Sequence, residues 1–152
     1  MLNIYNPKEG IFPFFIHADP LLEDTAFPTH THGLTEIGWP EFLMDPLSFG
    51  GEGNGAMINN AYCYFINNMD ELQAILNWQT LKYPVNVISP RWQNAPIYTV
   101  CFRRVSEKFE AVKLAYPAGV LLGMKFIQIW IDGDDYALTD EYYVGGVKPL
   151  RY

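Results

Sequence analysis

Two histidines separated by one residue, His30 and His32, are followed by Glu36, and a third histidine, His17, precedes them. Residues two positions apart in a β-strand project from the same face, so both imidazoles would lie on one side of a strand. Imidazole and carboxylate groups bind divalent transition metals, and a His-x-His pair can hold an ion while coordination positions stay open. The spacing therefore supports a metal-site hypothesis with His17, His30, His32 and Glu36 as ligands.

The same spacing resembles the first metal motif of cupins. Cupins flank that motif with glycines, whereas Asp24 and Leu43 stand at those places here, and no histidine follows for a second motif. The competing interpretation is that His30 and His32 are half-buried strand residues that donate to carbonyls or carboxylates. We favour this interpretation, so the sequence predicts no cofactor, with a divalent transition metal as the alternative.

Other patterns typical of catalysis are weak in this sequence. Cys63 falls within an apolar helical pattern and Cys101 within a strand pattern, so both thiols are expected to be reduced, buried and inert. The glycine-rich run 50–55 is predicted to be a loop that starts a helix, because Glu52 would oppose phosphate binding there. The sequence also lacks a Gly-x-Ser-x-Gly motif. It therefore predicts no catalytic residues.

Tryptophan residues give the best indication of a binding surface. Trp39 lies in a Gly-Trp-Pro corner and Trp92 lies in a loop bracketed by prolines, so both are expected to be partly exposed. Exposed tryptophans are common anchors in binding sites. We take Trp39, Glu41 and Trp92 as candidate binding residues, and exposed aromatic surface would also be compatible with a homodimer.

The net charge of −7 is unevenly distributed along the chain. Residues 1–80 carry ten acids and one base, whereas residues 81–152 carry seven acids and nine bases. Neither half has the clustered Lys/Arg surface that nucleic-acid binding needs, so no nucleic-acid partner is expected. The acidic first half could instead bind a basic protein partner, and its aromatic residues could bind a small ligand.

The sequence also bears on localisation. The N-terminal segment has no basic region followed by an apolar region, so no signal peptide is predicted. The longest apolar block, 118–124, is too short to span a bilayer. Two separated cysteines indicate neither a disulfide framework nor a zinc knuckle. These features predict a cytoplasmic protein that does not contact membranes.

Hydrophobic spacing predicts a single domain over residues 1–152. Strands are expected at 11–18, where Pro13 marks an edge strand, and at 29–34, 41–44, 85–88, 97–105 and 125–131, with a turn at 132–133 and a return strand. Helices are expected from the glycine-rich run to residue 66, from a capping box of Asn68 and Glu71 to about residue 81, and from Ser106 to Pro117. The order is not a regular βαβ alternation. We therefore predict an α+β fold with a mixed or antiparallel sheet and two to three helices packed on one face.

Three short segments stand out: His30-Thr31-His32-Gly33-Leu34, Gly38-Trp39-Pro40-Glu41, and Ile127-Gln128-Ile129-Trp130-Ile131-Asp132-Gly133. Together they resemble the Tyr-Thr-x-Gly-Leu, Gly-x-Pro-Glu and Leu-Gln-x-x-Trp-x-Asp-x-x-Gly patterns of an uncharacterised bacterial domain-of-unknown-function family. The resemblance spans most of the chain and implies a bacterial, cytoplasmic protein, with no established reaction. The family has tyrosine and an aliphatic residue where this chain has its two histidines, so the resemblance implies no family-wide metal site.

The sequence therefore favours a non-catalytic binding or interaction module, similar in kind to immunity proteins, with an acidic and aromatic N-terminal half. The alternative is a metal-dependent enzyme that uses the His-x-His-x3-Glu cluster. Loss of partner binding with added salt would support the first hypothesis. Stoichiometric metal in the purified protein would support the second.

Overall fold

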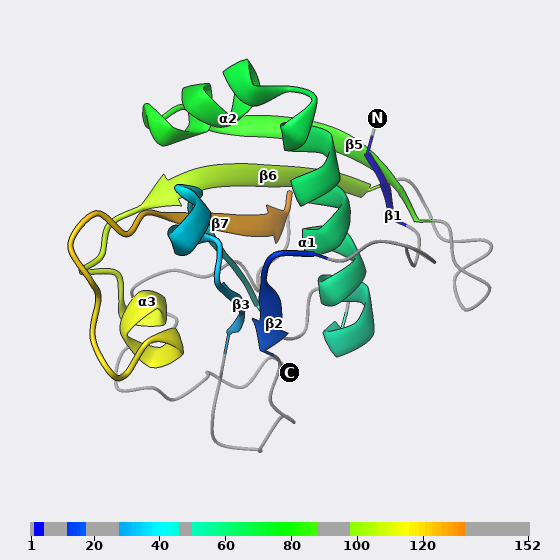
Figure 1. Ribbon diagram of the computed structural model, residues 1–152. Helices are drawn as coiled ribbons and strands as arrows, with labels where there is room; N and C mark the ends of the chain where they lie inside the picture. The colour runs from blue at the N-terminus through cyan, green and yellow to red at the C-terminus, as the bar shows by residue number, and fades with distance from the viewer. Residues whose placement is uncertain (1, 5–11, 18–27, 46–49, 88–97, 133–152) are drawn as a thin grey trace.

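A computed structural model describes residues 2–4, 12–17, 28–45, 50–87 and 98–132, and every structural statement below concerns these residues. Seven strands form one sheet, accompanied by three α-helices and a short 3-10 helix (Figure 1). The strands are β1 (Leu2–Ile4), β2 (Phe15–His17), β3 (Thr29–His32), β4 (Glu41–Met44), β5 (Leu81–Val87), β6 (Tyr98–Val105) and β7 (Phe126–Ile131). The helices are η1 (Thr35–Ile37), α1 (Gly50–Ile66), α2 (Met69–Leu76) and α3 (Glu110–Ala115). The predicted α+β fold with a mixed sheet is confirmed.

The strand order is β1-β5-β6-β7-β4-β3-β2. β1 runs parallel to β5 and β4 parallel to β7, whereas the other neighbouring strands are antiparallel. β2 stands at one end of the sheet, which confirms the predicted edge strand, and Pro13 lies just before it. The histidine-bearing strands β2 and β3 therefore form one end of the sheet, next to β4.

The two faces of the sheet carry separate apolar clusters. α1 and α2 pack on one face, against strand residues that include Phe42, Phe102 and Ile127. α3 packs on the opposite face, against Leu43 and Phe126. Alternation along the strands explains the division, because neighbours such as Phe42 and Leu43 point to opposite faces. Two helices thus share one face, as predicted, and the third covers the other.

α1 includes the glycine-rich run 50–55, which corrects the prediction of a loop there. The physical reason is close packing against the β2 and β3 end of the sheet (Figure 1). A Cβ atom on Gly55 would lie 3.9 Å from a β2 side chain, which is an ordinary van der Waals distance, so α1 contacts β2 here. The buried Asn54 side chain donates to Thr29 Oγ1 at 3.1 Å and to the Asp45 carbonyl at 2.8 Å. None of the glycines in this run has a positive φ, so the run continues as helix and does not form a turn.

α2 begins after Asn68 as predicted, but not through the predicted capping box. The Asn68 side chain makes no capping hydrogen bond and instead donates to the Tyr64 carbonyl oxygen at 2.8 Å. The helix ends at Leu76 rather than near residue 81, and Leu81 already begins β5. The chain leaves the helix at Trp78, which has a φ of 72°. Tryptophan rarely takes this conformation, so the sequence did not indicate the helix end.

Smaller differences concern the remaining elements. β1 was not predicted, and β5 begins early enough to include Pro84. β1 pairs with β5 only from Val85 onward, so the missing N–H of Pro84 falls outside that ladder. α3 begins after Phe109, and the Ser106 hydroxyl accepts a backbone hydrogen bond in the turn before it. The predicted return strand lies outside the described residues.

Among the residues that the structure describes, no helix is both long enough and apolar enough to cross a membrane.

The carboxylate of Glu71 joins α1, α2 and β5. It accepts hydrogen bonds from the Tyr64 hydroxyl at 2.7 Å and from the Tyr83 hydroxyl at 3.0 Å. Burial, and then the bonded Glu71 carboxylate, raises the pKa of Tyr64 to about 12. The same causes raise the pKa of Tyr83. Both phenols therefore remain proton donors at neutral pH and connect the helix pair to the sheet.

Replacing Tyr64 with Phe is expected to make stability less sensitive to alkaline pH. The pKa of Tyr64 is raised from its ordinary 10 to about 12, so the folded state retains a proton that the unfolded state loses. Its contribution is complete below pH 10 and is lost as the pH rises towards about 12. Urea denaturation between pH 10 and about 12 should show that the free energy of unfolding decreases less with pH for Tyr64→Phe than for wild type. Tyr62→Phe, on the same helix without a bond to Glu71, is the control, and equal declines in all three proteins would contradict the expectation.

Candidate metal centre

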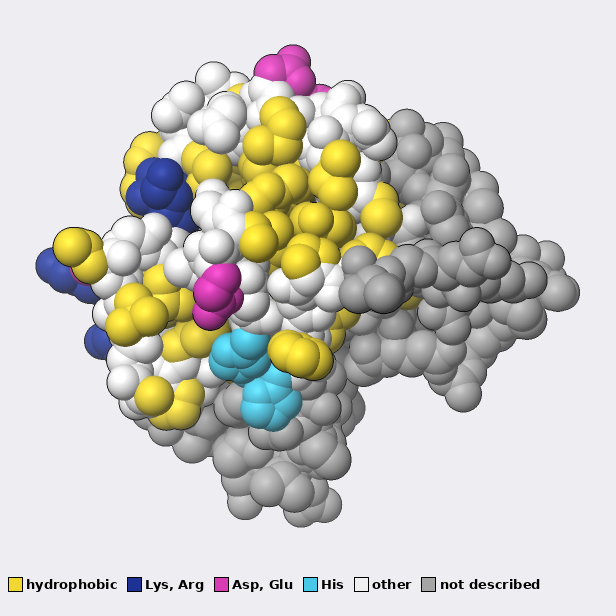
Figure 2. Space-filling view, viewed as in Figure 1, with side chains coloured by type: hydrophobic (Ala, Val, Ile, Leu, Met, Phe, Trp, Pro, Cys, Tyr) yellow, Lys and Arg dark blue, Asp and Glu magenta, His cyan; other side chains and the backbone are white. Residues whose placement is uncertain are grey.

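Strand register gathers the three histidines at the β2 and β3 end of the sheet. His17 pairs directly with His30, and Phe15 pairs with His32. His30 is also opposite Leu43, which belongs to the apolar cluster beneath α3, so the histidines lie on the α3 face. The prediction that His30 and His32 share a face is confirmed. Figure 2 shows histidine side chains together at the surface, beside a hydrophobic side chain.

The three imidazoles lie close enough to share one ion. One ligand nitrogen from each of His17, His30 and His32 lies within 4.8 Å of the other two. The Nε2 atoms of His30 and His32 are 2.9 Å apart. Nitrogen ligands of tetrahedral zinc lie about 3.4 Å from one another, because Zn–N distances are about 2.1 Å. Small side-chain rotations would therefore bring the three nitrogens to the geometry of a three-histidine site.

The hydrogen bonds of His30 fix which of its nitrogens can bind a metal. Its Nδ1 lies 2.8 Å from the carbonyl oxygen of Pro28. A carbonyl only accepts, so Nδ1 carries a proton, and Nε2 is the nitrogen that faces His32. An N–H bonded to a backbone carbonyl is the usual support of a metal-binding histidine. The buried His30 ring is thus oriented as a ligand would be.

Tyr116, just after α3, packs on the histidine pair. Its ring centroid lies 5.1 Å from that of His30 and 5.3 Å from that of His32. Its hydroxyl donates to the carbonyl oxygen of Thr31 at 2.6 Å. Burial, and then the charge of Glu41, raises the pKa of Tyr116 well above that of an ordinary tyrosine. The hydroxyl is therefore held by the backbone of β3, and the ring supports the two imidazoles.

Glu41, a predicted binding residue, is only 2% exposed and is bonded within its own chain. Its Oε1 accepts from the Thr31 hydroxyl at 2.8 Å and from the Leu34 N–H at 3.3 Å. Its Oε2 accepts from the N–H and the hydroxyl of Thr35. These bonds tie the segment between β3 and β4 to the start of β4. They therefore fix the position of His32 at the end of β3.

A pocket of about 280 Å³ opens beside His32. Its wall includes Glu36 from η1, and Tyr116 and Leu121 from the chain after α3. Glu36 is exposed and is not one of the three converging residues, so the predicted fourth ligand lies on the pocket wall. The pocket thus brings an imidazole and a carboxylate to the same small cavity.

The other candidate residues lie apart from this site. Trp39 is half-buried, and its ring centroid lies 4.8 Å from that of Tyr62 on the α1 face of the sheet. Trp92 lies outside the described residues. Cys101 is buried as expected, whereas Cys63 is exposed, which corrects the prediction of a buried thiol. Cys63 lies on the outward side of α1, two positions from buried residues in either direction.

Three supporting residues were not predicted: Thr31, Thr35 and Tyr116. Tyr116 is 85 positions from Thr31, and no local pattern indicates a contact over that separation. The two threonines are typical of strand and turn segments, so their types carry no functional indication. Their spacing becomes informative only when Glu41 is known to be buried between them.

Comparisons with known proteins do not extend these observations. No protein-family model matches the chain, and no curated protein or solved structure matches it. The resemblance to a bacterial domain-of-unknown-function family stays a prediction. Function is therefore inferred from the histidine cluster and its surroundings.

Replacing Glu41 with Gln is expected to lower the free energy of unfolding by about 2–4 kcal/mol. One of the two carboxylate oxygens would be replaced by an NH2 group, which cannot accept the hydrogen bonds that this oxygen now accepts. The remaining buried hydrogen bonds would be weaker, because the acceptor would no longer be charged. Urea denaturation measures the change. Glu36→Gln is the matched control, because Glu36 is exposed, and it should stay within about 0.5 kcal/mol of wild type. Equal stabilities for the two variants would contradict a structural role for Glu41.

Proposed function

We propose that this protein binds one divalent transition-metal ion, Zn²⁺ in the first instance, through His17, His30 and His32. The observation that supports the proposal is the convergence of three imidazoles from two neighbouring strands within 4.8 Å. Neutral imidazole is a common ligand of Zn²⁺. Because the Nδ1 of His30 is bonded to a carbonyl, its ligand atom would be Nε2.

The surroundings favour a catalytic centre over a structural one. Three protein ligands leave a fourth position for water or substrate, as in catalytic zinc sites. His32 lines a pocket of about 280 Å³, and Glu36 lines the same pocket. A metal-bound water loses its proton readily to a nearby base, and a carboxylate can serve as that base. We therefore propose metal-assisted hydrolysis of a small molecule, with Glu36 as the general base.

Purified protein is expected to bind one equivalent of Zn²⁺, measured by isothermal titration and by elemental analysis after dialysis. His30→Ala and His32→Ala should each weaken the affinity at least about a hundredfold, because an imidazole that binds the metal directly is lost. Acidification should weaken binding to the wild type, because protons compete with the metal for the imidazole nitrogens. The wild type should also melt at a higher temperature with Zn²⁺, by mass action.

Two control variants separate this site from other metal-binding groups. Cys63→Ser removes the exposed thiol, and Glu36→Gln removes the pocket carboxylate. Both should keep the wild-type affinity for Zn²⁺. Absence of stoichiometric binding in the wild type, or loss of binding in Cys63→Ser but not in the histidine variants, would refute the proposal.

The open coordination position has its own test. Protein loaded with Co²⁺ in place of Zn²⁺ should show visible absorption bands that shift when azide is added, because a small anion can replace a bound water. A spectrum that does not respond to azide would indicate a closed site. Metal binding would then remain, but the hydrolytic role would be excluded.

The acidic first half stays a separate prediction. Two of its acids, Glu41 and Asp45, are buried, and several others lie outside the described residues. An interaction with a basic protein partner is therefore proposed only as the second function, and binding that weakens strongly with added salt would support it. The cytoplasmic setting and the homodimer also stay predictions.

A further inference from the structure

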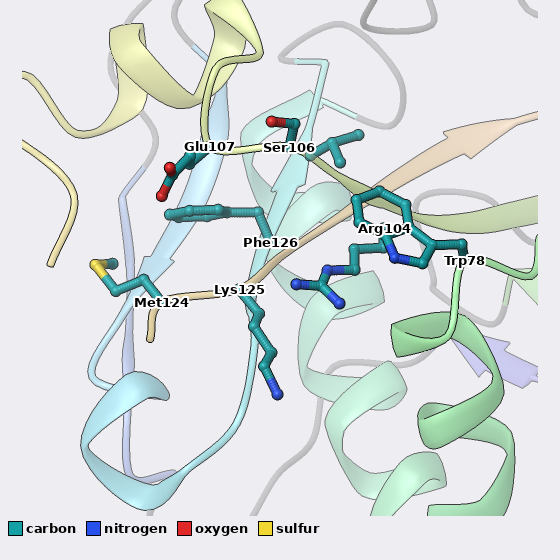
Figure 3. Close-up of a pocket in the computed structure, with 8 residues that line it drawn as sticks. Trp78, Arg104, Ser106, Glu107, Met124, Lys125 and Phe126 are labelled. Atoms are coloured by element: carbon teal, nitrogen blue, oxygen red, sulfur yellow. The ribbon is translucent and has the colours of Figure 1, made fainter. Parts of the chain in front are cut away.

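A second pocket, also of about 280 Å³, lies where β6 ends and β7 begins. Figure 3 shows Arg104 of β6 and Lys125, the residue before β7, on one side of it, with Trp78 beside Arg104. Glu107 lies apart from the two cations, near Phe126. None of these residues contributes to the histidine cluster. The pocket therefore requires an explanation of its own.

Trp78 occupies a position that normally belongs to glycine. Its N–H bonds to the Ile75 carbonyl at 3.0 Å, and the Gln79 N–H bonds to the Ala74 carbonyl at 3.1 Å. This pair of bonds is the Schellman motif, in which the residue after the helix is left-handed. Trp78 has a φ of 72° and is the one non-glycine residue with a positive φ in the described chain. A bulky aromatic residue is unfavourable here, and its side chain is 61% exposed.

The tryptophan ring holds a cation in a defined orientation. The Arg104 guanidinium carbon lies 4.5 Å from the centroid of the Trp78 ring. One guanidinium nitrogen donates to the Leu76 carbonyl at 2.9 Å. Arg104 pairs with Ile127 across the β6 and β7 ladder, and alternation places residue 125 on the same face. Two cations are thus brought to one edge of the pocket.

Neither cation has a carboxylate partner among the residues that the structure describes. The ion pair among those residues joins Lys82 of β5 to Asp132, which follows the other end of β7. A guanidinium that is stacked on one face and tethered at one nitrogen still has donors for a bidentate carboxylate. The fixed Arg104, with Lys125 nearby, is therefore suited to bind an anion.

The charge balance restricts which anion fits. Arg104 and Lys125 contribute two positive charges and Glu107 one negative charge, so the pocket favours a single negative charge. The chain as a whole carries −7, which disfavours polyanions such as nucleic acids. The apolar surfaces of Trp78 and Met124 line the same cavity.

We propose that this pocket binds a small organic monocarboxylate with a flat apolar body. Arg104 and Lys125 hold the carboxylate, and Trp78 and Met124 contact the body of the ligand. The unfavourable backbone conformation of Trp78 is retained because its ring orients Arg104 and forms part of the binding surface. The cationic residues of this site take no part in the proposed metal centre, although Met124 lines both pockets.

Benzoate is the probe, and wild-type protein is titrated by isothermal titration and ligand-observed NMR in the presence of EDTA. The chelator prevents benzoate from binding to a metal at the histidine cluster. Benzoate is expected to bind with a dissociation constant in the millimolar range or tighter, and more tightly than inorganic phosphate. Lys125→Gln is expected to weaken binding about tenfold, through loss of a charge-assisted contact. Lys82→Gln, which removes a surface cation elsewhere, should bind benzoate like wild type.

Trp78→Gly separates binding from folding. Glycine adopts a φ of 72° without strain, so this variant should melt at the wild-type temperature or above it. Its affinity for benzoate should nevertheless fall about tenfold, because the aromatic surface is lost and Arg104 is no longer stacked. Three outcomes would overturn the proposal: no benzoate binding to wild type at millimolar concentration, tighter binding of phosphate than of benzoate, or wild-type affinity in both Lys125→Gln and Trp78→Gly.

Discussion

A buried carboxylate that needs hydrogen-bond donors organises the end of the sheet where the histidines lie. An uncompensated charge in the interior costs several kcal/mol, so the chain around Glu41 has to supply donors. Four donors come from one short segment, through Thr31, Leu34 and Thr35. The path of that segment is thereby fixed, because each donor has to point at the same carboxylate. His32 lies within this segment, so the hydrogen bonds to Glu41 also fix the position of His32.

Gly33 makes this path sterically feasible. Its φ is 110°, a conformation that side chains rarely adopt, and a Cβ atom there would lie 3.0 Å from the Pro13 carbonyl oxygen. The glycine therefore lets the chain before β2 pass close to the end of β3. That approach allows β2 to pair with β3 in the register that places His17 opposite His30. The network at Glu41 and the close approach at Gly33 thus act together to form the histidine cluster.

The sequence predicts those parts of the structure that depend on the local spacing of apolar and polar residues. Strand alternation correctly placed His30 and His32 on one face, and helical spacing located α1 and α2. The convergence of His17 depended on strand register, which no local pattern contains. Tyr116 depended on a contact across 85 positions. The site could therefore be predicted as a pair of histidines, but its supporting residues could not.

Two residues adopt states that their types disfavour, and the physical origin is the same. Glu41 is a carboxylate in the interior, where carboxylates are rare, and Trp78, which falls inside a predicted helix, adopts the left-handed conformation that tryptophan rarely takes. In each case a tertiary interaction overrides the local preference: donors from a turn surround Glu41, and Arg104 stacks on Trp78. Residues that adopt locally unfavourable states need such compensation, and both examples border a pocket.

The two pockets also share a wall. Met124 lines both of them, and its sulfur accepts a hydrogen bond from the Leu121 N–H at 3.2 Å. The segment between α3 and β7 therefore contributes to the histidine side and to the cationic side at once. Because β7 pairs in parallel with β4, the same segment leads into the strand that adjoins Glu41. Packing at the centre of the sheet thus fixes the wall that separates the proposed metal centre from the proposed anion site.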